Sequence, residues 1–257
     1  MSLMRYMLKS LLVVVLVWPA FASASLTQAE VNRLQLDIWR VRSDFHMYSV
    51  MAGDGEYRRT LNRSIDNAER SFRSFSGNAE SETERALASA IRPLWEEFIK
   101  AARDNRIAEQ GYTDTYAVQD VNQYAAQIAM RLYEYEGAAA ARGDDLMAMA
   151  AYMQRMASEY LFLSAAPEGG QAIGTDLGRV EFRVTVPEFD QMVAAALRTY
   201  GGDGSTGRAL QDVEAKWRFI RESLVKFYEN AVPFLVHRYT EQMVSQLQNA
   251  AEREQER

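Results

Sequence analysis

The 257-residue chain is 48% hydrophobic and 25% charged, has a formal net charge of −6 and contains no cysteine. These values are typical of a folded globular protein, and they exclude a disordered, collagen-like or disulfide-stapled chain. The lack of cysteine also excludes cysteine-ligated zinc, c-type haem and thiol nucleophiles. The stability of the fold must therefore come from packing.

Residues 1–24 have the pattern of a secretory signal peptide. Arg5 and Lys9 precede an apolar run, and Ala22-Ser23-Ala24 has the small-x-small form of a cleavage site. The run is shorter than the ~20 residues that a membrane span needs, so we expect cleavage after Ala24 and a periplasmic protein. Cleavage would change the net charge from −6 to −8, and an acidic surface disfavours nucleic acid as a partner.

In the first half of the chain, apolar residues recur at steps of three and four, which predicts helices that each bury one stripe. The first stripe covers residues 31–52, and Thr27 with Glu30 forms a capping-box pattern at its start. Two further stripes cover 61–75 and 87–101. Short connections between such helices predict antiparallel packing.

The next stripe is longer and keeps its frame from about Thr115 to Ser164, which predicts one long helix across Gly143. The alternative is a break, with Gly143 as the C-cap of one helix and Asp144 as the N-cap of the next.

Stripes over 182–200 and 210–234 predict two more helices. Beyond Pro233 the stripe changes frame, which predicts a hairpin and a last helix that begins at this proline. Residues 252–257 are expected to form a frayed, solvated tail.

The sequence contains an internal repeat. Arg40–Phe45 (RVRSDF) matches Arg155–Tyr160 (RMASEY), and Trp95 matches Trp217, with a helix breaker 16 residues beyond each tryptophan. Such self-similarity indicates two copies of one structural unit.

The repeat predicts an all-α fold, an elongated tandem of two antiparallel four-helix units that share the long central helix. The units would cover residues 25–143 and 144–251. A single compact bundle is the alternative.

The second copy, with Met153–Leu161 (MQRMASEYL), Phe189-Asp190, Trp217 and Val232-Pro233-Phe234, resembles the PilJ-like/NarX-like sensor family. These are periplasmic helical domains of type IV pilus chemotaxis transducers and nitrate-responsive histidine kinases, and the resemblance covers residues 26–248. It implies a soluble periplasmic sensory or ligand-binding module that acts with a membrane-bound signalling partner.

In the family's nitrate sensors, arginines of one helix bind the anion at a subunit interface, which implies a small anionic or polar ligand and allows a homodimer. The family's Gln-Arg-Met element is matched by Gln154-Arg155-Met156, and the repeat makes Arg40 the counterpart of Arg155. Met149-Ala150-Ala151 stands where the family has an earlier Arg-Met, which counts against nitrate itself. The predicted ligand residues are therefore Gln154, Arg155 and Arg40.

The alternative for both arginines is a surface ion pair with the acidic residue four positions on, Asp44 or Glu159.

No cofactor, metal site or enzymatic activity is expected. A ferritin-like di-iron site needs Glu-x-x-His, but Ser43 and Phe234 precede the two histidines, His46 and His237, at the acidic position. A haem bound by Met47 or Met51 together with His237 is conceivable, but methionine is more simply explained as core filling. Neither a Gly-x-Ser-x-Gly elbow nor a P-loop occurs.

The second functional hypothesis is a structural or adaptor protein that binds envelope or pilus-associated proteins through helix faces. Leu36, Trp39 and Val50 on the secondary face of the first helix are the candidates for an exposed apolar strip.

Overall fold

The computed structural model describes residues 26–136, 141–165, 179–202 and 204–257. Within these ranges the chain forms helices and no strand, which confirms the all-α fold. The helices are α1 (Gln28–Val50), α2 (Gly55–Gly77), α3 (Glu82–Arg103), α4 (Ile107–Gln110), α5 (Thr115–Tyr133), α6 (Asp144–Ala165), α7 (Phe182–Tyr200), α8 (Gly204–Val225) and α9 (Pro233–Gln255). The predicted signal peptide lies outside the described residues. Among the described helices, none is long and apolar enough to cross a membrane.

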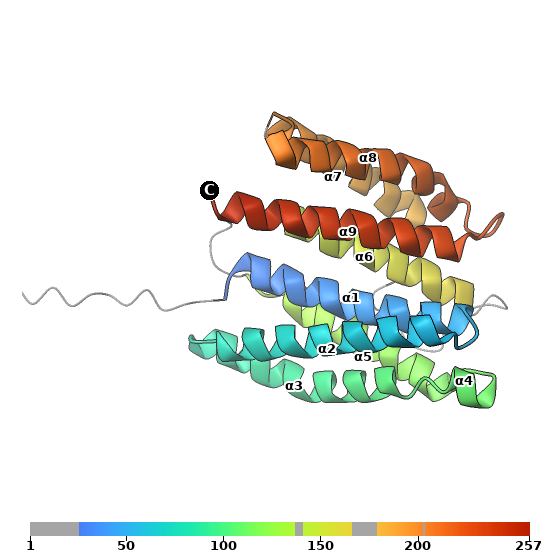
Figure 1. Ribbon diagram of the computed structural model, residues 1–257. Coiled ribbons are helices and arrows are strands. Elements are labelled where there is room, and N and C mark those ends of the chain that lie inside the picture. Colours follow the sequence, from blue (N-terminus) through green and yellow to red (C-terminus); the bar gives the residue numbers. More distant parts are fainter. Residues whose placement is uncertain (1–25, 137–140, 166–178, 203) are drawn as a thin grey trace, which may run out of the picture.

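Buried apolar side chains form two clusters. The first group of helices, α1, α2, α3 and α5, surrounds one cluster, and the second group, α6 to α9, surrounds the other (Figure 1). In the first, Trp95 stacks on Phe72 of the preceding helix with ring centroids 4.6 Å apart. In the second, Trp217 packs edge-on against Phe189 of the preceding helix at 4.7 Å. The two tryptophans that match in sequence therefore occupy equivalent settings.

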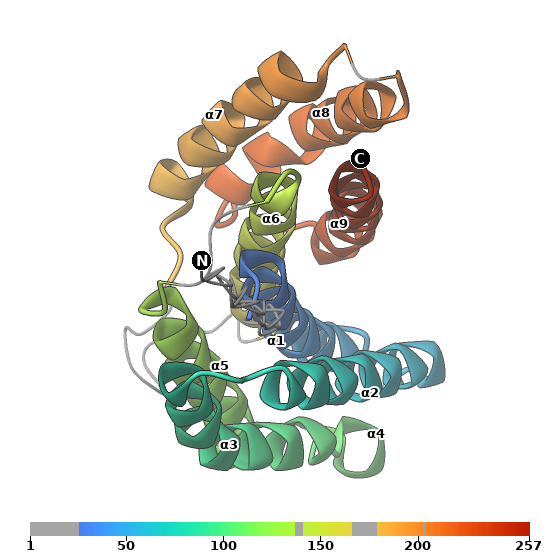
Figure 2. The ribbon, with the colours of Figure 1, turned by 90° about the vertical axis from the view of Figure 1, so that its left-hand side faces the viewer.

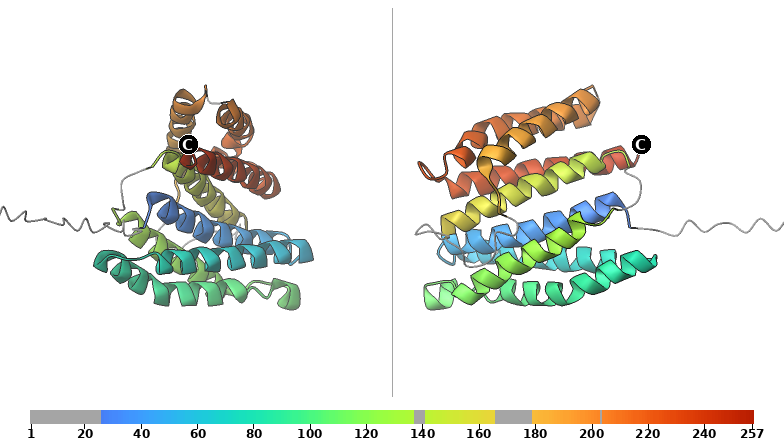
Figure 3. Two further views of the ribbon diagram at one scale, coloured as in Figure 1. Left: turned by 60° about the vertical axis from the view of Figure 1, so that its left-hand side comes forward. Right: turned by 180° about the vertical axis from the view of Figure 1, so that it is seen from behind.

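The two groups meet along α1 and α6, which lie at the centre of the molecule (Figure 2). Asn32 near the start of α1 donates to the carbonyl of Asp144 at the start of α6, and Arg42 further along α1 donates to Ser158 further along α6. The two helices therefore run in the same direction. The groups lie side by side along their length (Figure 3), and not end to end as the predicted elongated tandem requires.

The prediction of one long helix from Thr115 to Ser164 is wrong. α5 ends at Tyr133 and α6 begins at Asp144. Gly143 has φ +88°, a left-handed conformation that ends helical geometry and that glycine adopts most easily. The Asp144 carboxylate accepts a hydrogen bond from the backbone N–H of residue 141 at 2.7 Å. The alternative of a break is therefore closer to the structure, but Gly143 is not the C-cap of the preceding helix, because α5 already ends at Tyr133.

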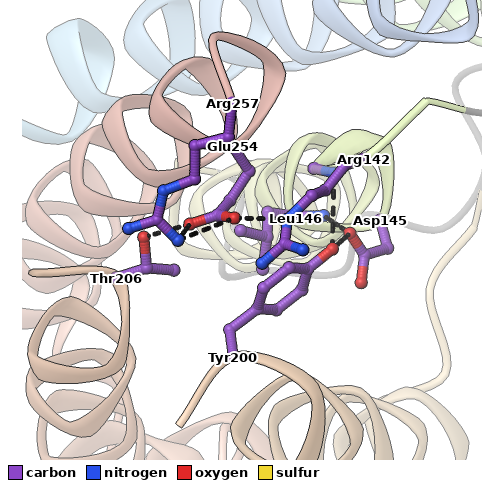
Figure 4. Close-up of polar contacts among 8 residues, drawn as sticks. Arg142, Asp145, Leu146, Tyr200, Thr206, Glu254 and Arg257 are labelled. Carbon is purple, nitrogen blue, oxygen red and sulfur yellow. Dashed lines mark hydrogen bonds and ion pairs between the residues drawn. The ribbon is translucent and has the colours of Figure 1, made fainter. Parts of the chain in front are cut away.

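The hairpin at Pro233 is confirmed, because α8 ends at Val225 and α9 begins at this proline. The expected frayed tail, in contrast, is wrong: α9 continues to Gln255, and Glu254 is only 1% exposed. The Glu254 carboxylate accepts from the Thr206 hydroxyl and from Arg142 Nε, both at 2.6 Å (Figure 4). These bonds tie the last turn of α9 to the starts of α8 and α6.

Candidate functional site

Two adjoining hollows of about 510 and 430 Å³ lie between α2 and α9, with α1 at their base. They share Arg40, Asn67 and Arg70, and we refer to them together as the α2–α9 groove. Its charged lining residues are Glu30, Arg33, Asp37, Arg40, Arg63, Asp66, Arg70 and Glu241.

Helical spacing gathers these side chains. On α1, Arg33, Asp37 and Arg40 follow at steps of four and three residues and share one side of the helix, as Arg63 and Arg70 do two turns apart on α2. The apolar residues of α1 and α2 pack in the cores, so the polar stripes of these two helices line the groove.

The arginines of α1 are partly paired within the groove. Arg33 Nη2 lies 2.6 Å from Glu252 Oε1 of α9. Arg40 Nη2 donates to Gln248 Oε1 of α9 at 3.0 Å, and its Nη1 lies 3.5 Å from Asp37 Oδ1. Both arginines therefore bridge from the first group of helices to the second.

The arginines of α2 have only neutral partners. Arg63 donates to the Thr60 hydroxyl at 3.0 Å, and Arg70 donates to the Asn67 side-chain oxygen. Within the described ranges, neither guanidinium lies within 4.0 Å of a carboxylate oxygen. Neither guanidinium is therefore held in a close ion pair, although Arg70 acts electrostatically on Asp37 and Arg63 on Glu241.

Asp37 forms a buried carboxyl at the base of the groove. Its residue is 5% exposed, and the Ser71 hydroxyl donates to its Oδ2 at 2.6 Å. Burial raises the pKa of Asp37, although this hydrogen bond and the nearby arginines act in the opposite direction. Burial likewise raises the pKa of Glu241 on α9, so two of the groove's carboxyl groups hold their negative charge less firmly than usual.

At one end of the groove, Asp44 of α1 meets His237 and Glu241 of α9. His237 Nε2 lies 2.8 Å from Asp44 Oδ1 and 3.9 Å from Glu241 Oε1, and the Ser64 hydroxyl donates to Asp44 Oδ2. Burial alone would lower the pKa of His237, but the hydrogen bond and charge of Asp44 outweigh it and raise this pKa. These three side chains are the described residues that could hold a metal ion.

No protein-family model, curated protein or solved structure matches this chain. The resemblance to the PilJ-like/NarX-like family therefore stays a prediction, and the site is interpreted from its own geometry.

The structure separates the predicted ligand residues. Arg40 lines the α2–α9 groove, whereas the Arg155 guanidinium lies about 6 Å from the rings of Trp39 and Tyr133, toward α5 on the other side of the α1–α6 pair (Figure 2). Gln154 is 2% exposed. The predicted site of Gln154, Arg155 and Arg40 is therefore not one site.

The alternative of surface ion pairs at a spacing of four residues is also wrong. Asp44 bonds to His237 of α9 and not to Arg40. Glu159 pairs with Arg42 of α1, not with Arg155. Both carboxylates are buried, at 2% and 5% exposed, so they find partners on neighbouring helices.

The predicted exposed strip on the first helix is wrong as well. Leu36 and Trp39 are 0% and 1% exposed, and Leu36 belongs to the core cluster of α6 to α9. The second apolar face of α1 is thus its contact with α6 of the same chain. Val50 is half-buried.

Sequence reasoning missed Arg42, the centre of a buried polar contact between α1, α5 and α6. Arg42 Nη2 lies 2.9 Å from Glu159 Oε2, Nη1 donates to the Ser158 hydroxyl at 2.9 Å, and Nε donates to Asn122 Oδ1 at 2.6 Å. His46 shares Asn122 at 3.0 Å, and burial together with the charge of Arg42 lowers its pKa to about 3. This arrangement holds helices together and is closed to a ligand.

Proposed function

We propose that this protein is a non-enzymatic module that binds a small anionic ligand in the α2–α9 groove and passes the signal to a membrane-bound partner in the periplasm. The observation that carries the proposal is that Arg63 and Arg70 line the groove together with Arg40 and have no carboxylate partner among the described residues. Guanidinium groups bind carboxylates and other oxyanions through paired, charge-assisted hydrogen bonds. The resemblance to a family with arginine-bound anions supports the same ligand class.

The groove is less negative than the chain as a whole. The chain carries a net charge of −6, but the groove is lined by equal numbers of arginines and carboxylates. Burial raises the pKa of two of these carboxyl groups, Asp37 and Glu241. The arginines of the groove can therefore hold an anion although the chain as a whole is negatively charged.

Binding is favoured over catalysis by the order of the polar residues at the end of the groove. A Ser-His-Asp arrangement needs the histidine between the hydroxyl and the carboxylate. Here Asp44 lies between Ser64 and His237, so the imidazole cannot take the proton of that hydroxyl.

The test is a panel of small anions, including nitrate, nitrite, sulfate, phosphate and dicarboxylates, measured by thermal shift and by isothermal titration calorimetry. A ligand at 100 times its Kd should stabilise the folded chain by about 2.7 kcal/mol. Arg70→Gln should weaken binding about 10- to 100-fold, because a hydrogen bond to a charged group contributes about 1.5–3 kcal/mol. Arg73→Gln is the matched control, since Arg73 is exposed on the same helix outside the groove.

Two results would contradict the proposal. The first is the absence of a saturable shift with every anion. The second is binding that Arg155→Ala abolishes and Arg70→Gln leaves intact, which would move the site to the far side of the α1–α6 pair.

One observation supports the second hypothesis, that of an adaptor protein, but it lies at the α8–α9 turn and not on the first helix. Aromatic side chains are exposed around the α8–α9 turn, where Phe219 is 60%, Tyr228 85% and Phe234 46% exposed. Exposed aromatics of this kind are typical of protein contact sites. In a pull-down from envelope extracts, Tyr228→Ser together with Phe219→Ser should lose the partner that the unmodified protein retains, and retention of that partner would refute this use of the turn.

A further inference from the structure

We propose that Asp44, His237 and Glu241 form a binding site for one divalent transition-metal ion, such as Zn²⁺ or Mn²⁺, at the end of the α2–α9 groove. The site goes beyond the anion binding proposed above and does not depend on it.

The geometry needs little adjustment to accept an ion. One ligand atom from each of the three side chains lies within 4.8 Å of the others. Metal–ligand distances of about 2.0–2.2 Å place neighbouring ligand atoms about 3–3.5 Å apart. The distances from His237 Nε2 to Asp44 Oδ1 and to Glu241 Oε1, 2.8 and 3.9 Å, lie on either side of that range. His237 and Glu241 are one turn apart on α9, so both can reach one ion from a single rigid helix.

The internal repeat shows why Asp44 is available for a cation. Its counterpart in the second copy is Glu159, whose charge is neutralised by Arg42 across the α1–α6 contact. The counterpart of Arg42 in the second copy is Ala157, which cannot neutralise Asp44 in return. Among the described residues, Asp44 has no arginine or lysine within 4.0 Å, and its ion-pair partner is His237. A buried carboxylate at 2% exposure is left facing an imidazole, which is itself a metal ligand.

The charges balance with a divalent ion. Two carboxylates and a neutral imidazole carry −2, which a 2+ ion cancels. The metal binds Nε2 of a neutral imidazole whose remaining proton is on Nδ1, so an imidazolium releases its Nε2 proton to solvent and the metal takes the place of that proton beside Asp44 Oδ1. Proton release of this kind is general for histidine-ligated metals. The Ser64 hydroxyl remains bonded to Asp44 Oδ2 and so orients the carboxylate, as partners of metal ligands commonly do.

The same turn of α9 carries a buried threonine. Thr240 lies between His237 and Glu241 in sequence, and its position on α9 is within about 60° of His237 around the helix axis. It is 1% exposed, and its hydroxyl has no hydrogen-bond partner in the described part of the chain. Buried hydroxyls almost always have a partner, so this turn of α9 has a buried polar group that bound water would satisfy.

The open coordination positions would face the arginines. Arg40 and Arg63 both act electrostatically on the Glu241 carboxylate, and both line the groove next to it. Three protein ligands leave room for water on the ion, which is where an anion in the groove could also bind the metal.

The experiment uses the full chain, freed of metal with EDTA and titrated with Zn²⁺ by calorimetry and with Co²⁺ by visible absorbance, in buffer without coordinating anions. We expect one saturable site per chain. Glu241→Gln should weaken binding at least tenfold, and His237→Gln should abolish the Co²⁺ absorbance. Zn²⁺ affinity should also fall as the pH drops below the pKa of His237, because a proton competes for Nε2. His46→Gln and Glu252→Gln are the controls, since His46 is the other histidine and Glu252 pairs with Arg33 away from the cluster; both should bind metal like the unmodified chain.

Asp44→Asn removes the buried partner of His237, and this variant can fail to fold. Glu241 has a side chain that is 47% exposed, so Glu241→Gln should keep the fold and is the variant that decides. Circular dichroism checks the fold of each. Absence of saturable binding, or binding that Glu241→Gln and His237→Gln leave unchanged, would overturn the metal site. Neither result would bear on the anion titrations with Arg70→Gln.

Discussion

Replacing Arg42 with methionine should cost this protein a large part of its stability. The guanidinium is buried, at 5% exposed, and bonds to Glu159, Ser158 and Asn122. Its removal leaves the Glu159 carboxylate, with a side chain 6% exposed, as a buried charge without its cation. Breaking a buried pair in this way costs about 3–5 kcal/mol, and at about 2–4 °C per kcal/mol for a chain of this size the Tm should fall by about 6–20 °C.

The assay is urea unfolding followed by circular dichroism and tryptophan fluorescence. The matched control is Arg218→Met, which breaks an ion pair with Glu214 whose side chains are 69% and 31% exposed and should cost less than about 1 kcal/mol. The double variant Arg42→Met with Glu159→Met should be more stable than Arg42→Met alone, because it removes the stranded charge. The reasoning is refuted if Arg42→Met loses no more stability than Arg218→Met.

Four further predictions concern two histidines, a glycine and the end of the chain. The pKa of His46 is lowered from 6.5 to about 3, so between these values the unfolded chain binds a proton that the folded chain does not. Stability should therefore fall by up to about 1.4 kcal/mol for each unit by which the pH drops, and less steeply in His46→Gln. The pKa of His237 is raised above 6.5, so its contribution is fully present below pH 6.5 and is lost as the pH rises through the folded pKa; the stability difference from His237→Gln should shrink only above pH 6.5. Gly143→Ala should cost more than about 1 kcal/mol in urea unfolding, because φ is +88° and the new Cβ would lie 2.7 Å from a backbone oxygen, whereas Gly77→Ala, with open space around it, should change stability by less than about 1 kcal/mol. Glu254→Gln should lower the Tm and speed proteolysis of the C-terminus, and a variant as resistant as the unmodified chain would show that the buried carboxylate is not what anchors this end.

The helices could be predicted from the sequence because their signals are local. The capping box of Thr27 and Glu30 is present, and Pro233 begins the last helix, since both depend only on residues within one turn. The connection between α5 and α6 could not be predicted in the same way. Apolar periodicity keeps its frame whether or not the residues between two stripes are helical, so it does not register the left-handed turn at Gly143.

Such local patterns could not predict contacts between distant segments of the chain. The second apolar face of α1, with Leu36 and Trp39, indicated that this face has a partner, but not that the partner is α6 of the same chain. Arg40 was predicted as a ligand residue and lies in the groove, yet Arg63 and Arg70 looked like ordinary surface residues of α2. Asp44 and His237 are 193 positions apart, so no motif spacing could join them.

The two walls of the α2–α9 groove, α2 and α9, come from different copies of the internal repeat. α1 and α2 belong to the first copy, and α9 belongs to the second. A ligand held between these helices would therefore link the two copies of the repeat. Any sliding of one copy past the other would change the width of the groove.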